Sequence, residues 1–458
     1  MRQTFSLQEK RRHFLAVLWP ILITQLGVYA MIFFNTVMSG NAGADDLAGV
    51  AIGASFWMPL STGITGILLA LTPIVAHYMG AGHREKVPFV VLQGAYLAVA
   101  LALCVILFGA LTLKPILNNM HLDAAVRDIA LRYLKGLSLG IMPFFVYMVF
   151  RCFIEALGQT RVTMLITLTS LPINFLMNYL LIFGKLGFPR LGGVGAGYAT
   201  AITYWCILLM ALYVVHRVEP FALFGLFKKR YAVSPAAWVE HLKLGVPIGC
   251  SIFFETSFFT GVTLLMSRYG TATIAAHQAA LNFSSMLYMV PLSISMALTI
   301  TVGFEVGAKR YRDARQYSLI GICIALGMAI CCGIGLLLLN ERVAGLYTKD
   351  LSVLLLTKQF LLFAIFFQLS DAIATPMQGV LRGYKDVNWA FFITLASYWL
   401  IGLPLGHILS VCTSWGAFGY WIGFNAGLAM GASCLIGRMI SVQRKYRLPQ
   451  MYPGYKQL

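Results

Sequence analysis

Stretches of about 20 apolar residues recur twelve times along this chain of 458 residues, and each is long enough to cross the roughly 30 Å hydrocarbon core of a membrane. Only 11% of the residues are charged and 59% are hydrophobic, whereas a soluble globular protein carries about 25% charged residues. A helix satisfies its own backbone hydrogen bonds in lipid. We therefore predict an all-α polytopic membrane protein with twelve transmembrane helices.

Basic residues predict how these spans are oriented. The even number of spans places both termini on one side, and the tails and loops of that side hold 24 of the 34 Lys and Arg residues. Since positive charge is retained in the cytoplasm, we expect a multi-pass protein of the cell membrane with both termini cytoplasmic. The predicted spans cover residues 14–38, 47–76, 88–112, 131–152, 162–184, 192–215, 243–267, 274–303, 316–340, 355–380, 388–409 and 416–440.

The formal net charge of +18 has two interpretations. Nucleic-acid proteins carry such an excess of positive charge, but membrane topology explains it better in so apolar a chain. We expect lipid and small molecules as partners, and no nucleic acid.

The second half of the sequence repeats features of the first half. A shift of 227 residues superposes a proline, several small or aromatic residues and a Gly-Ala pair that precedes a basic segment. The matched residues are Pro20 with Pro247, Gly43 with Gly270, Ala48 with Ala275, Phe56 with Phe283, and Gly80-Ala81 with Gly307-Ala308. Repeats of this kind are typical of secondary transporters. We predict two six-helix bundles of the same orientation, residues 1–222 and 223–458.

Two acidic residues, Glu255 and Asp371, lie where a bilayer disfavours charge. Each is eleven to thirteen positions from the nearest basic residue on either side, which at about 1.5 Å per residue places it near the midplane. An acid there costs about 2.5 to 3.5 kcal/mol, and no Lys or Arg is predicted at matching depth. We expect these acids to be protonated or to bind a cation such as Na⁺; a structural carboxylic acid, hydrogen-bonded to a neighbouring helix, is the alternative.

Polar side chains continue along the same helix faces. Asp371, Thr375 and Gln378 follow one stripe. On the eighth span a second stripe within about 120° of one face comprises Gln278, Asn282, Ser285 and Tyr288. Such stripes line a water-accessible cavity or hold helices together.

The first half has no acid at the depth of its polar residues. Asn174 and Asn178 share one face of the fifth span, and Asn35 lies on the first. We include these three, with Ser55 on the second span, among the predicted substrate contacts. His277, next to Gln278, is a further candidate for substrate contact.

Together these features resemble the multidrug and toxic compound extrusion (MATE) family, in its NorM-like branch. The resemblance covers nearly the whole chain. Its most specific parts are Met79-Gly80-Ala81-Gly82 before a basic loop, Pro247 followed by Glu255, Ala275-Ala276-His277-Gln278, and Asp371 followed by residues 376–383 (PMQGVLRG).

What the family does is implied by this resemblance. Its members are antiporters that expel organic cations while Na⁺ or protons enter. The resemblance implies that Glu255 and Asp371 bind the coupling cation, that Tyr288 contacts it, and that Gln278 and Asp350 lie near drug.

Two residues depart from the family pattern. Many relatives have an Asp five residues before a Gly in the first span, where this chain has Asn35 before Gly40. Some have Tyr at the position of Phe367. The first departure argues against a titrating switch in the first half.

The sequence therefore predicts a cation-coupled exporter of hydrophobic organic cations. It needs no cofactor beyond its coupling ion, Na⁺ or H⁺, and we expect it to act as a monomer. The alternative is a flippase for a lipid-linked sugar, which would require a basic cavity for pyrophosphate. An intramembrane enzyme would require a nucleophile or metal cluster, and neither is predicted.

Overall fold

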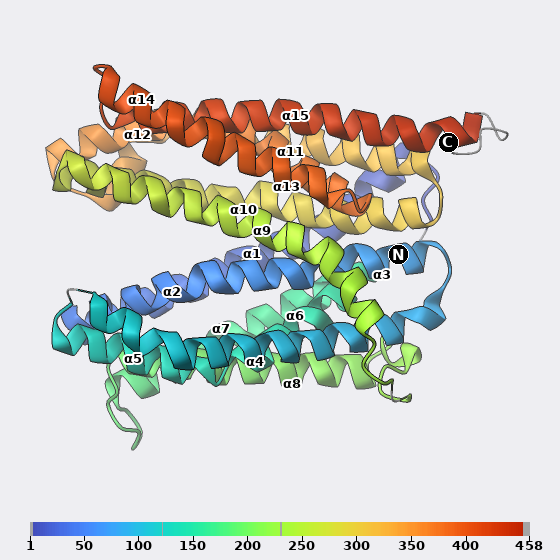
Figure 1. Cartoon of the computed structure of the whole chain (residues 1–458), viewed down its shortest axis with the longest axis horizontal. Helices are drawn as coiled ribbons and strands as arrows, with labels where there is room; N and C mark the ends of the chain where they lie inside the picture. Colours follow the sequence, from blue (N-terminus) through green and yellow to red (C-terminus); the bar gives the residue numbers. More distant parts are fainter. Residues whose placement is uncertain (1–2, 121, 230, 452–458) are drawn as a thin grey trace. The chain divides into compact units, whose positions relative to one another are not determined.

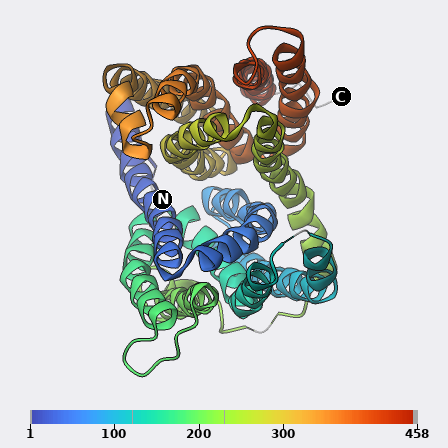
Figure 2. The same ribbon diagram turned by 90° about the vertical axis from the view of Figure 1, so that its left-hand side faces the viewer.

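The computed structural model describes residues 3–120, 122–229 and 231–451, and these residues form helices and loops with no strand. Within these ranges eleven helical segments are long and apolar enough to cross a membrane, and a bent pair of helices raises the number to twelve. Apart from their ends, they coincide with the twelve predicted spans. Figure 1 shows the helices with their labels, and in Figure 2 many are seen nearly end-on.

The chain forms two compact units. Unit 1 is Met1–Leu22 with Cys250–Leu458, and unit 2 is Ile23–Gly249. Helix α1 (Leu7–Ala42) and helix α9 (Pro235–Met266) each begin in one unit and end in the other. The crossing points, after residues 22 and 249, are 227 positions apart and each follows a proline by two residues, Pro20 and Pro247.

The compact units differ from the bundles 1–222 and 223–458 at two places. Both differences arise because α1 and α9 are continuous helices that each begin in one unit and end in the other. The boundary predicted from the sequence lies instead in a charged linker. The repeat of two six-helix bundles stays a prediction.

Unit 2 has its own apolar core. Besides its parts of α1 and α9, its helices are α2 (Ala44–Leu69), α3 (Leu71–Gly80), η1 (Arg84–Lys86), α4 (Val87–Asn119), α5 (Ala124–Ser138), α6 (Ile141–Ala156), α7 (Thr160–Phe183), α8 (Gly193–Arg217) and η2 (Ala222–Phe224). The fourth span is the bent pair, α5 and α6, at 48°. Pro143 explains this bend, because it has no N–H for the carbonyl of Leu139.

Unit 1 packs around α12. Besides its parts of α1 and α9, its helices are η3 (Ser267–Tyr269), α10 (Thr271–Gly307), α11 (Tyr311–Tyr347), α12 (Leu351–Gly383), α13 (Val387–Leu395), the π-helix η4 (Ala396–Gly402), α14 (Leu403–Cys412) and α15 (Phe418–Met451). Helix α12 contacts α10 most extensively, and α11 and α15 as well.

The α10–α12 contact is close because Gly379 has no side chain. A Cβ on Gly379 would meet the backbone oxygen of Ser295 on α10. Thr299 on α10 donates its hydroxyl hydrogen to the carbonyl of Gly379 over 3.1 Å. This contact fixes the C-terminal part of α12, about two turns after Asp371, against α10, which carries Tyr288.

Candidate functional site

Both midspan acids lie in unit 1 and are buried. Asp371 is 1% exposed and Glu255 is 9% exposed. Thr375, one turn after Asp371 on α12, donates a hydrogen bond of 2.7 Å to Asp371 Oδ1. The other carboxylate oxygen, Oδ2, is buried and has no hydrogen-bond partner among the described residues. A buried acceptor without a donor is costly, so Oδ2 is suited to receive a proton or a cation.

Two tyrosines interact with Glu255. Tyr288 on α10 lies within electrostatic range of Glu255 and Asp371, so the structure brings the three predicted coupling residues together. Tyr398 interacts with Glu255 from the π-helix η4. Tyr398 was not predicted, because a π-helix has no signature in residue spacing.

The expectation that no basic residue accompanies the acids is wrong. Arg382 is buried, and its guanidinium interacts electrostatically with Glu255 and Tyr288. Its Nη2 donates a hydrogen bond of 3.3 Å to Gln378 Oε1, one turn back along α12. Helical side chains tilt toward the N-terminus of their helix, so this long side chain reaches deeper than its backbone position indicates.

A proline connects this site to the helix packing. Pro291 on α10 has no N–H, which leaves the carbonyl of Leu287 without its helical donor. Gln368 on α12 supplies a hydrogen bond of 3.3 Å from Nε2 to that carbonyl. Its Oε1 is buried and unpartnered among the described residues, one turn from Asp371. Two acceptor oxygens without donors thus lie on one stretch of α12.

The polar residues predicted in the first half form a separate network in unit 2. Asn178 Nδ2 donates to Asn35 Oδ1 over 2.6 Å and to Asn174 Oδ1 over 3.0 Å. Helix α8 completes the network, since Thr200 accepts from Asn35 at 3.3 Å and Thr203 accepts from Asn174 at 3.2 Å. The two threonines were missed, although their i, i+3 spacing on an apolar span was a usable signal. The network contains amides and hydroxyls, and no ionisable group.

Four other residues that were predicted to contact substrate do not belong to this network. Gln278 and Ser55 are exposed, and the Ser55 hydroxyl donates to the carbonyl of Ala51 in its own helix. Asn282 accepts a hydrogen bond of 3.1 Å from Tyr347. A drug-binding role for these residues and for Asp350 stays a prediction.

Asp350 caps a helix. It is the N-cap of α12 and accepts from the backbone N–H of Ser352 at 2.8 Å and from its hydroxyl at 2.6 Å. These bonds favour the ionised carboxylate and hold the pKa of Asp350 below its usual range.

His277 belongs to the core of unit 1. It is 0% exposed, accepts a hydrogen bond of 3.1 Å from Trp421 Nε1 at its Nδ1 and lies 3.2 Å from the Thr263 hydroxyl through its Nε2. The interpretation of His277 as a substrate contact is therefore replaced by a structural role, because both ring nitrogens are already partnered.

Comparisons with known proteins agree with this architecture. The family model described as MatE matches residues 20–180 and 247–408. The chain is similar to the "Probable multidrug resistance protein NorM" of Halalkalibacterium halodurans, with 60% identity over 446 residues and 97% of each chain covered. A protein of the same name from Bacillus subtilis is 54% identical over 450 residues, covering 98% of this chain and 100% of the relative. The crystal structure of the eukaryotic MATE transporter AtDTX14 has the same fold, with a TM-score of 0.83 at 21% identity, covering 96% and 99% of the two chains.

The helical spans and these similarities define a multi-pass membrane transporter rather than an enzyme. The family match covers more than half of the sequence in two segments, and the curated relatives match nearly its full length. The chain belongs to the MatE family of MATE transporters.

Proposed function

We propose that the chain is an antiporter of the cell membrane that exports hydrophobic organic cations as Na⁺ or protons enter. The observation that carries this proposal is the buried Asp371, with one carboxylate oxygen unpartnered among the described residues, near Glu255 and Tyr288. The similarity to proteins named for multidrug resistance supports the substrate class.

The coupling ion uses this chain's own oxygen atoms. A proton binds Asp371 Oδ2 directly, whereas Na⁺ requires several oxygen ligands, for which Asp371, Glu255 and Gln368 Oε1 are candidates. Each positive charge that enters in excess of the charge that leaves with the drug yields about 2.3 kcal/mol per 100 mV. That free energy supports a drug gradient of about fiftyfold.

The alternative, a flippase for a lipid-linked sugar, is less consistent with the charges. Among the described residues the buried Lys and Arg side chains are Lys10, Arg151 and Arg382. Lys10 pairs with Asp313 and Arg151 pairs with Glu155, both at 2.7 Å. Arg382 lies in range of Glu255. Since each buried basic group already has an acidic neighbour, a pyrophosphate would meet little uncompensated positive charge.

The experiment that tests this function is drug efflux from proteoliposomes that contain the purified chain. A Na⁺ gradient and a proton gradient are imposed separately, with the membrane potential clamped. Efflux that follows one gradient identifies the ion. Efflux that ignores both gradients contradicts the proposal.

Tyr288→Phe and Tyr288→Leu separate the ring from the hydroxyl. An aromatic face binds a desolvated cation with about 2 kcal/mol, so we expect Phe to retain most transport and Leu to lose at least about tenfold in affinity, which corresponds to 1.4 kcal/mol. The measurement is the half-saturating concentration of drug and of the coupling ion. Equal values for wild type, Phe and Leu would assign Tyr288 to packing.

Asn35→Ala tests whether the unit 2 network takes part in coupling. Asn35 cannot titrate, so we expect a modest change in drug affinity or rate and an unchanged number of cations exchanged per drug. Removing its two side-chain hydrogen bonds costs about 1 kcal/mol for each. Reversal potentials of drug flux in proteoliposomes report the stoichiometry, and a changed value would place coupling in unit 2.

A further inference from the structure

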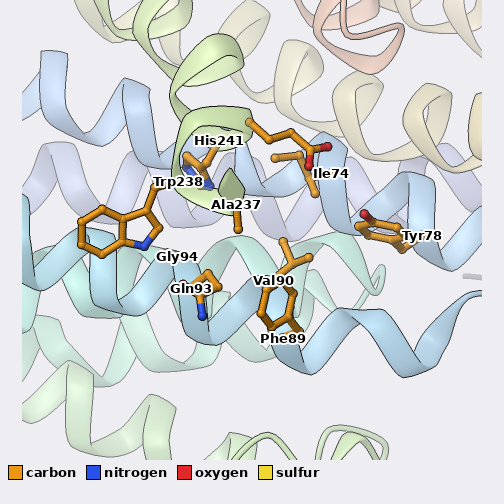
Figure 3. A pocket seen from close by; sticks show the side chains of 10 residues that line it. Ile74, Tyr78, Phe89, Val90, Gln93, Gly94, Ala237, Trp238 and His241 are labelled. Carbon is orange, nitrogen blue, oxygen red and sulfur yellow. The ribbon is translucent and has the colours of Figure 1, made fainter. Parts of the chain in front are cut away.

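A cavity of about 50 Å³ lies within unit 2, where the first turns of α9 pack on α3 and α4 (Figure 3). Its walls include three aromatic side chains, Tyr78, Phe89 and Trp238, and one carboxylate, Glu240. A single water needs about 10 to 15 Å³ measured in this way. The cavity therefore has room for a head group of a few non-hydrogen atoms.

The segment that precedes α9 is hydrogen-bonded to a residue that lines this cavity. Gln93, a buried lining residue on α4, donates a hydrogen bond of 2.7 Å to the carbonyl of Ala232 and accepts one of 2.9 Å from the N–H of Ser234. His241 on α9 lies 3.1 Å from the carbonyl of Ile67. Both walls are thus fixed by polar contacts, and a ligand meets a preformed site.

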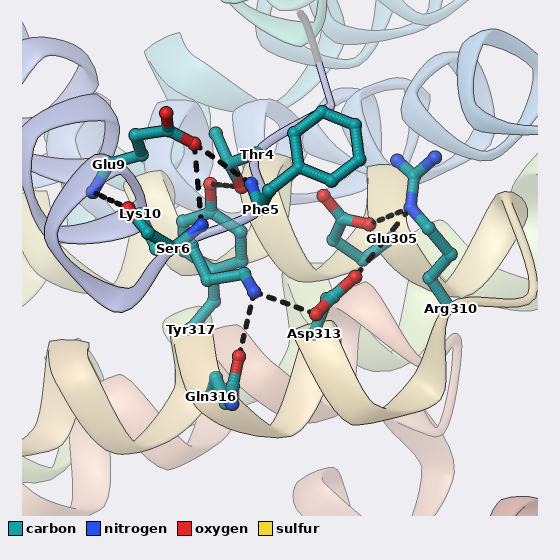
Figure 4. A network of polar contacts seen from close by, with 10 residues as sticks. All are labelled: Thr4, Phe5, Ser6, Glu9, Lys10, Glu305, Arg310, Asp313, Gln316 and Tyr317. Atoms are coloured by element: carbon teal, nitrogen blue, oxygen red, sulfur yellow. Dashed lines mark hydrogen bonds and ion pairs between the residues drawn. The ribbon is translucent and has the colours of Figure 1, made fainter.

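A shift of 227 residues relates residues that line this cavity in unit 2 to residues around the Lys10 side chain in unit 1. The offset separates both the helix crossing points and the starts of the two matched segments. By it, Ala237 corresponds to Lys10. In unit 1 the Lys10 side chain is 3% exposed, and its ammonium lies 2.7 Å from Asp313 Oδ1 and 2.7 Å from Gln316 Oε1 (Figure 4). The residue equivalent to Gln316 is Phe89, which lines the cavity. The residue equivalent to Asp313 is Lys86, so the place in unit 2 has the room that Ala237 leaves but not the carboxylate that holds the Lys10 ammonium in unit 1.

The lining of the unit 2 cavity is suited to a cation. Aromatic faces attract ammonium groups, and the Tyr78 ring already lies 5.9 Å from the Lys86 ammonium. Glu240 adds a negative charge. The Nε1–H of Trp238 is buried and has no acceptor among the described residues. Its nitrogen-bearing edge faces the other lining side chains in Figure 3, so a ligand with an oxygen acceptor would satisfy it.

We propose that this cavity binds the ammonium head group of a small aminoalcohol. The nitrogen contacts Glu240 and the aromatic rings, and the oxygen accepts from Trp238 Nε1. The same chemistry occurs in a free amine and in an ethanolamine lipid head group. The site is separate from the carboxylates of unit 1 and goes beyond the proposed antiport, because it depends on none of the coupling residues.

The experiment uses the full chain labelled with 5-fluorotryptophan. The ¹⁹F resonance of Trp238 is assigned by its loss in Trp238→Phe, and the chain in detergent is titrated with ethanolamine and with ethylammonium. We expect a saturable shift with ethanolamine and at least about tenfold weaker binding of ethylammonium, which lacks the oxygen. Nanodiscs of phosphatidylethanolamine and of phosphatidylglycerol distinguish the sources: a resonance that differs between the two lipids identifies the lipid head group, and a response to free ethanolamine alone identifies the free amine.

Variants make the test specific. Ala237→Lys supplies the ammonium of the other repeat and should remove the response, and Glu240→Gln should weaken binding about tenfold. Glu85→Gln, which removes an exposed acid outside the cavity, is the matched control and should bind as wild type. Asp371→Asn should keep the response even where coupled efflux is lost, which separates this site from the proposed function. An Ala237→Lys variant that responds like wild type, or no saturable shift in any arm, overturns the proposal. Equal affinity for the two amines overturns the aminoalcohol assignment.

Discussion

We expect Asp371→Asn to abolish efflux driven by an ion gradient, and Glu255→Gln to do the same. Each amide keeps the shape of its carboxylate but can neither accept a proton nor contribute charge to a Na⁺ site. In Asp371→Asn the hydrogen bond from Thr375 to Oδ1 can persist. Because an acid at midspan costs about 2.5 to 3.5 kcal/mol, we expect Asp371→Asn to insert and fold. Glu255→Gln also removes the acidic neighbour of Arg382, so Asp371→Asn is the cleaner of the two variants. The measurement is drug efflux from proteoliposomes under the gradient that drives the wild type.

Asp128→Asn is the matched control for this pair of variants. Asp128 is 60% exposed and pairs with Arg132 at 3.4 Å, and such surface pairs contribute about 0 to 1 kcal/mol. The control should transport at the wild-type rate. Drug binding measured without a gradient separates lost coupling from lost affinity. Wild-type coupled efflux by Asp371→Asn or by Glu255→Gln would show that the carboxylate concerned is not a coupling group.

Depth along a span was enough to find the centre of this site. Glu255 and Asp371 were predicted from apolar windows and distances to flanking charges. Helical periodicity placed Tyr288 on a polar stripe, and its contact with the cation was implied by the family resemblance. The structure places the three side chains in one electrostatic cluster. This works because a bilayer fixes where a helix begins and ends, so a position in the sequence becomes a depth. The twelve spans were predictable for the same reason.

Contacts made by long side chains and irregular helices were not predictable in this way. Arg382 was assigned to a span end by its position, but its side chain extends back to Gln378 and approaches Glu255. Tyr398 lies near Glu255 from a π-helix. Pro404, which cannot donate to the carbonyl of Leu400, is the one local signal of that irregularity. π-helical turns occur frequently at functional sites.

Partners decide what a polar residue does, and the sequence did not reveal them. His277 was interpreted as a substrate contact because it precedes Gln278, yet Trp421 and Thr263 engage both its ring nitrogens. The division of α1 and α9 between the two compact units was also not predicted. The predicted spans 14–38 and 243–267 already continued past Pro20 and Pro247, as proline permits in membrane spans, but residue spacing does not show that each helix begins in one unit and ends in the other.

Gly379→Val disrupts the α10–α12 contact on which the carboxylate site depends. A Cβ at residue 379 would lie 2.6 Å from the Ser295 hydroxyl oxygen and 2.7 Å from the Ser295 Cα. Rotation of a side chain cannot relieve the contact with Cα, so α12 must move away from α10. Overpacking typically costs about 1 to 3 kcal/mol, and for a chain of this length we expect an apparent melting temperature lower by about 1 to 3 °C.

The same displacement moves Asp371 away from Tyr288, so coupled efflux should be lost even at temperatures where Gly379→Val remains folded. Gly327→Val on α11 is the control, because a Cβ there meets nothing within 4 Å, and it should melt and transport as wild type. Thermal unfolding followed by size-exclusion chromatography, together with efflux from proteoliposomes, measures both effects. If Gly379→Val melted and transported like Gly327→Val, close packing at residue 379 would not be what positions the carboxylates.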